Sequence, residues 1–154
     1  MSATTLSIGL ILTSQQYTVP AASGSSSAVM FSRAQDSRWP GWVHPTMRTL
    51  RALLQLPRNW DGYGANEVQE SAVNGSWNLL VEIMNDDTLA PSIVPLSDGG
   101  IQIEWHRHGR NLEIEFFRDE APSFYFYETD NGVEDEGPAH ENLELLRKML
   151  AEMK

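Results

Sequence analysis

The sequence predicts an α+β domain, in which an antiparallel meander of three or four strands packs against two or three helices. Apolar residues recur at three- and four-residue spacing in residues 46–85, and they alternate with polar residues in residues 101–116. These helical and strand patterns occupy separate blocks of the chain. With 154 residues, 41% of them hydrophobic, the chain fits one soluble domain, which we place at residues 45–154 after an N-terminal arm.

The arm is expected because residues 1–32 contain no charged side chain and residues 20–27, PAASGSSS, have the composition of a flexible linker. We therefore interpret residues 1–44 as a flexible or partner-dependent segment. The apolar residues 6–12 have no basic residue before them, which favours a short strand or partner-dependent segment over a signal peptide. No apolar run approaches the roughly 20 residues that cross a bilayer. We expect a cytoplasmic protein of a bacterial cell or phage-infected host.

Three helices are predicted after the arm. The first covers residues 46–56, with Pro45 at its first position and Pro57 ending it. The second begins after an Asn66 cap and ends near Asn85. The third follows a loop at residues 129–137, and its apolar residues can cover the sheet. These residues are Leu143, Leu146, Leu150 and Met153.

The strands are predicted from alternation and turn residues. With His108 and Gly109 at the centre of a hairpin turn, every apolar residue of residues 101–105 opposes an apolar residue of residues 112–116. A strand at residues 92–96 is confined to the sheet edge by Pro91 and Pro95. Residues 123–128 form the fourth strand.

The same hairpin register places Glu104 opposite Glu113, and Glu115 opposite Gln102, on the outward face. Like charges that face each other across a ladder are unfavourable, and we consider three explanations. Solvent with Arg107 or Arg110 would screen them, a basic partner would neutralise them, or Glu104, Glu113 and His106 would bind a metal.

The histidines and aromatic residues are further candidates. If His106 and His108 both faced Glu104, their protonation would be favoured and partner binding would depend on pH. Trp60 and Tyr63 bracket Asp61 in a turn, where aromatic residues either cover the end of a core or form an interaction surface. Tyr125 and Tyr127 would join the glutamate face if their strand pairs in phase.

No sequence motif indicates catalysis: there is no phosphate loop, nucleophile elbow, dinucleotide fingerprint or zinc-protease helix. The chain also lacks cysteine. We therefore assign no catalytic residue, metal ligand or cofactor. An enzyme would have to assemble a metal-dependent hydrolase site from the carboxylates of several turns and strands. These carboxylates are Asp61, Asp98, Glu104, Glu113 and Glu115.

Residues 56–117 carry a recurring pattern, LPRNWDGYGA at 56–65 followed by DGGIQIEW at 98–105 and LEIE at 112–115. In this pattern the chain resembles a family of small uncharacterised bacterial and phage proteins. The resemblance implies no activity and no functional residue, and the arm lies outside it.

The charge distribution supports our leading hypothesis. Residues 91–154 hold 6 basic and 14 acidic groups, and the whole chain has a net charge of -10, which disfavours direct contact with nucleic acid. We expect a non-catalytic protein that binds a basic protein partner, as an antitoxin, an immunity protein or a phage inhibitor that imitates nucleic acid. The binding residues would be Glu104, Glu113, Glu115, His106, Trp60, Asp61, Tyr63, Tyr125 and Tyr127. A metal-dependent hydrolase and a virion or assembly component with an ordering arm are the alternatives.

Overall fold

The computed structural model describes residues 39–154 as one compact unit, so the predictions made for residues 1–38 lie outside the described residues. The helices of this unit are α2 (Val43–Leu53), α3 (Glu70–Ile83) and α4 (Leu143–Glu152), with a 3₁₀ turn η1 (Ala139–Glu141) before α4. The strands are β1 (Ser92–Pro95), β2 (Ile101–Arg107), β3 (Arg110–Phe116), β4 (Ser123–Glu128) and β5 (Val133–Pro138).

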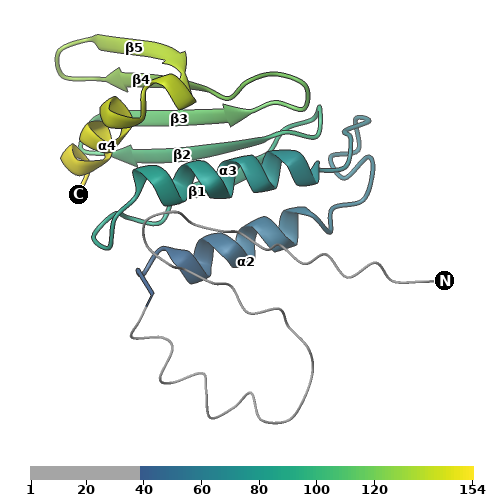
Figure 1. Cartoon of the computed structure of the whole chain (residues 1–154). Helices are drawn as coiled ribbons and strands as arrows, with labels where there is room; N and C mark the ends of the chain where they lie inside the picture. Colours follow the sequence, from purple (N-terminus) through teal and green to yellow (C-terminus); the bar gives the residue numbers. More distant parts are fainter. Residues whose placement is uncertain (1–38) are drawn as a thin grey trace, which may run out of the picture. The chain divides into compact units, whose positions relative to one another are not determined.

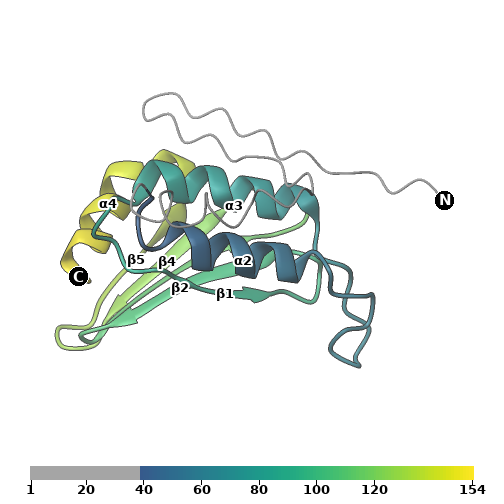
Figure 2. The same ribbon diagram turned by 90° about the horizontal axis from the view of Figure 1, so that it is seen from below.

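The unit has two layers. The five strands form one open antiparallel sheet in the order β1-β2-β3-β4-β5. Helices α2, α3 and α4 lie side by side on one face of this sheet (Figures 1 and 2). The predicted α+β class and antiparallel meander are therefore confirmed. We call the sheet face that is turned away from these helices the open face.

The predicted hairpin register is confirmed at every position. Glu104 pairs with Glu113, and Arg107 pairs with Arg110. His108 and Gly109 have φ angles of 51° and 72°, as a type I′ turn requires, and this turn matches the twist of the flanking strands. The local sequence therefore determines which residues of β2 and β3 share a face.

The core lies between the sheet and the helices. Ile103 and Ile114 form a cross-strand pair with no exposed surface, and Leu80 of α3 and Leu146 of α4 are equally buried. At the start of α2 the indole of Trp42 packs against Trp77, with ring centroids 5.7 Å apart. Its Nε1 donates a hydrogen bond to the backbone oxygen of Asn85 at 3.1 Å. This aromatic pair secures α2 to α3.

Several predicted boundaries are wrong. The first helix begins at Val43 and ends at Leu53, so residues 39–44, assigned to the arm, belong to the folded unit. Pro45 fits in the first turn because backbone N–H groups there have no acceptor within the helix, so a proline loses no hydrogen bond. The second helix begins at Glu70, and Asn66 does not cap it. The Asn66 backbone N–H and side chain instead bind the β1–β2 turn, at the Ser97 and Asp98 oxygens.

The predicted loop at residues 129–137 is also wrong, because β5 occupies most of it. Tyr127 pairs with Glu134 and Tyr125 with Glu136. All but one of its six residues are exposed, so the strand forms through backbone pairing with β4 and contributes little to the core. Its addition extends the open face by one strand.

Candidate functional site

The open face carries alternate residues of all five strands, and antiparallel pairing arranges them in rows. One row runs Ser92, Glu104, Glu113, Tyr125 and Glu136. A second runs Val94, Gln102, Glu115, Ser123 and Pro138. A third runs His106, Asn111, Tyr127 and Glu134. Of the nine residues predicted to bind a partner, the sheet brings six together: Glu104, Glu113, Glu115, His106, Tyr125 and Tyr127.

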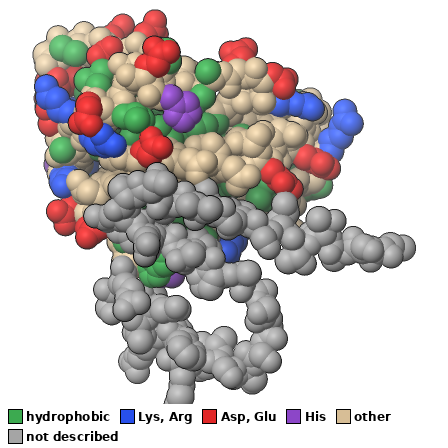
Figure 3. All heavy atoms as spheres, viewed as in Figure 1, with side chains coloured by type: hydrophobic (Ala, Val, Ile, Leu, Met, Phe, Trp, Pro, Cys, Tyr) green, Lys and Arg blue, Asp and Glu red, His purple; other side chains and the backbone are tan. Residues whose placement is uncertain are grey.

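The carboxylates of this face are not accompanied by lysine or arginine. Its rows contain five glutamates and no lysine or arginine. The helix side differs, because basic and acidic side chains both appear there (Figure 3). Within the described residues, the open face is therefore a patch where negative charge is not locally offset by arginine or lysine.

The Glu104–Glu113 pair is stabilised from within the sheet. The Gln102 side-chain amide donates to the Glu104 Oε1 at 3.0 Å and to the Glu113 Oε2 at 3.1 Å. His106 places its Nε2 3.1 Å from Glu104 Oε2 and its Nδ1 2.7 Å from the Asn111 Oδ1. Both ring nitrogens face oxygen atoms, so these hydrogen bonds, with Asn111 first and Glu104 second, raise the pKa of His106.

Arg107 and Arg110, which were expected to screen these glutamates, bind other groups. Arg110 Nε donates to the Glu128 carboxylate at 2.7 Å, and its Nη1 donates to the backbone oxygen of Glu152 at 2.9 Å. Arg107 Nε donates to His108 Nε2 at 3.1 Å. The alternation of side chains along a strand explains this result, because Arg107 and Arg110 have the parity of the helix-facing residues.

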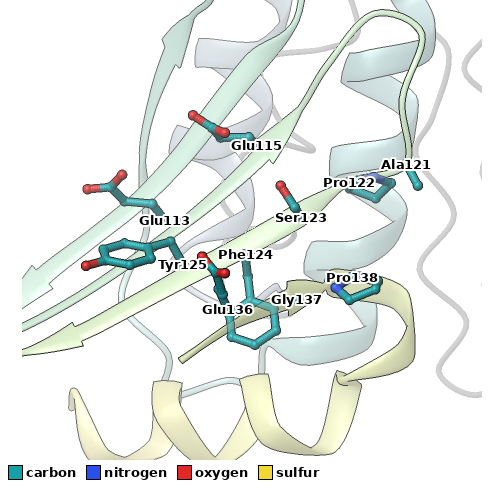
Figure 4. A pocket seen from close by; sticks show the side chains of 10 residues that line it. All are labelled: Glu113, Glu115, Ala121, Pro122, Ser123, Phe124, Tyr125, Glu136, Gly137 and Pro138. Atoms are coloured by element: carbon teal, nitrogen blue, oxygen red, sulfur yellow. The ribbon is translucent and has the colours of Figure 1, made fainter. Parts of the chain in front are cut away.

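A shallow pocket of about 660 Å³ opens where β3, β4 and β5 meet. Glu113 and Glu115 reach it from β3, Tyr125 from β4 and Glu136 from β5 (Figure 4). Ala121, Pro122 and Pro138 add apolar surface. The pocket thus combines carboxylates with an aromatic ring and an apolar rim.

Burial and neighbouring negative charges raise the pKa of two groups in this pocket. Partial burial, followed by the charges of Glu113 and Asp98, raises the pKa of Glu115. Desolvation and the nearby Glu134 carboxylate likewise raise the pKa of Tyr125. Each additional negative charge at this end of the face is therefore unfavourable.

Trp60, Asp61 and Tyr63 lie in the α2–α3 loop, outside the ladder rows. Asp61 Oδ1 accepts hydrogen bonds from the backbone N–H groups of Tyr63 at 2.8 Å and Ala65 at 3.1 Å, which lower its pKa. Trp60 Nε1 donates to the Asn66 oxygen at 3.2 Å. These two side chains order the loop, whereas Tyr63 is 95% exposed at its tip.

Glu134 and Glu136 also lie on the open face but were not predicted from the sequence. Residues 133–138 contain no alternation of apolar and polar residues, which is the pattern that identified the other strands. Only their antiparallel pairing with Tyr127 and Tyr125 places both glutamates on the open face. The two-residue spacing of Glu134 and Glu136 was the available sequence signal, because residues two apart in a strand lie on the same face of the sheet.

Within residues 39–154, no group of three or more histidine or acidic side chains is arranged to hold a metal ion. The proposed ligands Glu104, Glu113 and His106 instead make the hydrogen bonds described above. No helix in the same residues is long and apolar enough to span a bilayer. Comparisons of the chain with protein-family models, curated proteins and solved structures give no match.

Proposed function

We propose that this protein is a non-catalytic interaction protein whose open face binds a basic protein partner. The proposal depends above all on the sign of the charge on the open face, which holds five glutamates and no lysine or arginine. An antitoxin, an immunity protein or an inhibitor of a nucleic-acid-binding complex would use such a face.

The energetics favour a cationic partner. Glu104 and Glu113 are directly opposed, and Glu115 lies one row away on the same strand. Arginine or lysine side chains brought to this face would offset the mutual repulsion of these carboxylates. The uniform sign would also accelerate encounter with a basic surface at low ionic strength.

The pocket gives a partner side chain a place to enter. Its carboxylates can accept hydrogen bonds from a guanidinium or ammonium group, and the ring of Tyr125 can contact the same cation. Its apolar rim suits the methylene groups of an arginine or lysine stem. The pocket therefore supports the proposal by shape as well as by charge.

The proposal is tested by calorimetric titration with hexa-arginine as a defined basic probe. We expect salt-sensitive binding that the combined substitution Glu104→Gln, Glu113→Gln and Glu115→Gln weakens about tenfold, since exposed ion pairs each contribute about 0.2–1 kcal/mol. Circular dichroism should show that the fold is retained.

The matched control replaces three exposed glutamates outside the ladder rows, Glu70→Gln, Glu82→Gln and Glu141→Gln. It changes the net charge equally. Affinity should remain within about twofold of the unsubstituted protein, because these three glutamates are not among the open-face carboxylates that would pair with the probe. Equal affinities of all three proteins would refute the open face as the binding site.

A further inference from the structure

We infer that the basic partner supplies an extended segment that pairs with the outer edge of β5 as a sixth strand. This inference rests on the proposed function and specifies its binding mode. β5 is the last strand of the sheet, and within residues 39–154 no strand pairs with its outer side. An unpaired edge offers backbone donors and acceptors to an incoming strand.

The hydrogen-bond phase identifies the available groups on β5. Ala139 N–H donates to the Pro122 oxygen at 2.9 Å, immediately beyond the Ser123–Pro138 pair. In an antiparallel ladder, bonded and non-bonded pairs alternate. The backbone N–H and C=O groups of Glu134 and Glu136 therefore point away from β4, towards the free edge.

The edge is limited at one end. Pro138 has no N–H to offer, and its oxygen accepts a hydrogen bond from the Asn142 Nδ2 at 2.9 Å. The edge at β1 is less suitable, because it has only four residues and ends at Pro95. An added strand therefore has its two bonded pairs at Glu134 and Glu136.

The side chains of β5 select the chemistry of the incoming segment. Partner residues bonded to Glu134 and Glu136 would have their side chains on the open face, opposite these carboxylates. A second copy of β5 would place acidic groups opposite acidic groups. Charge complementarity therefore indicates arginine or lysine at alternate positions of a basic extended segment.

The binding mode is tested with the synthetic peptide Thr-Arg-Val-Arg-Thr and two N-methylated forms, measured by calorimetry with the full chain. Methylation of both arginine nitrogens removes the donors that would face β5, so we expect affinity to fall at least tenfold. Methylation of the valine and the second threonine removes outward-facing donors, so we expect affinity within about threefold of the parent peptide. All three peptides have the same charge.

Two variants locate the binding to the edge of β5. Glu136→Pro removes a charge and an outward N–H that β4 does not use, whereas Glu136→Gln removes the charge alone. We expect Glu136→Pro to bind the parent peptide at least fivefold more weakly than Glu136→Gln. Unchanged thermal unfolding of both variants would show that the ladder is intact. If Glu136→Pro unfolds, the binding site is located instead in the unsubstituted protein, from the nuclear magnetic resonance shifts that the parent peptide causes in the β4 and β5 amides.

The outcomes separate the two proposals. Equal binding of both methylated peptides would overturn strand addition while leaving charge-driven binding to the open face. If the arginine-methylated peptide binds more strongly than the peptide methylated at valine and threonine, the assignment of the arginine N–H groups to the edge of β5 is wrong. If neither the parent peptide nor hexa-arginine binds, both the strand-addition inference and the proposed function fail.

Discussion

At the scale of single residues, Gln102 bridges two carboxylates that oppose each other across the β2–β3 ladder. Its amide donates to both Glu104 and Glu113, while His106 contacts the other oxygen of Glu104. These hydrogen bonds offset part of the repulsion between the two carboxylates. Glu113 and Glu115 remain beside the pocket, where a basic partner would find acceptors.

Glu115 should destabilise the fold when it is ionised. Its pKa is raised above the unfolded value, first by burial and then by Glu113 and Asp98. The ionised side chain therefore destabilises the fold above its folded-state pKa, and this penalty disappears below the unfolded value of about 4.5. We expect Glu115→Gln to increase the free energy of unfolding by up to about 1 kcal/mol at neutral pH, measured in urea.

The gain from Glu115→Gln should vanish when the same titration is repeated at a pH well below 4.5. Exposed Glu120, in the turn between β3 and β4, provides the control, and Glu120→Gln should have little effect at either pH. A loss of stability at neutral pH, or a gain that does not depend on pH, would contradict the electrostatic account.

At the scale of elements, the β1–β2 turn connects the sheet to the α2–α3 loop. The Gln69 N–H donates to the Gly99 oxygen at 2.8 Å, and Gly100 lies against the end of β3. A Cβ at Gly100 would be 2.3 Å from the Phe116 backbone oxygen. This turn therefore depends on close backbone contact that larger residues would prevent.

Gly100→Ala should lower the free energy of unfolding by about 1–3 kcal/mol, because the backbone of the turn or of β3 must move. Gly41→Ala is the matched control, since a Cβ there has open space. Both are measured by chemical denaturation. A Gly100→Ala protein as stable as the Gly41→Ala protein would show that the two segments are not in close contact.

The elements also show what the sequence determines. The β2–β3 hairpin was predicted residue by residue, because alternation along both strands and the His108-Gly109 turn require the same register. The face shared by Glu104, Glu113 and Glu115 followed from it, and Tyr125 joins this face because β4 pairs with β3 in phase. Local patterns were sufficient for the register of this hairpin, and they located the helices without fixing where each begins and ends.

Where tertiary contacts decide the structure, the sequence patterns failed. β5 has almost no buried side chain, so its strand conformation depends on the backbone of β4. Asn66 resembles a helix cap, but it is held by the β1–β2 turn. The pairing partners of Arg110 also depend on α4, which is 42 residues away at Glu152.

At the scale of the molecule, the separation of charge follows from the two-layer architecture. The helices cover one face of the sheet, and basic side chains occur on that side together with acidic ones. The open face concentrates glutamates from β2, β3 and β5 around Tyr125. The open face therefore carries glutamates with no lysine or arginine among them, whereas the rest of the described unit carries charges of both signs.

The most direct test of this surface is a nuclear magnetic resonance titration of the isotope-labelled protein with hexa-arginine. We expect salt-sensitive shifts concentrated in the amides of β2–β5 and in the side chains of Gln102 and Tyr125, with α2 and α3 little affected. Shifts centred on the helices, or spread evenly over all acidic residues, would contradict the claim that the open face binds a basic partner.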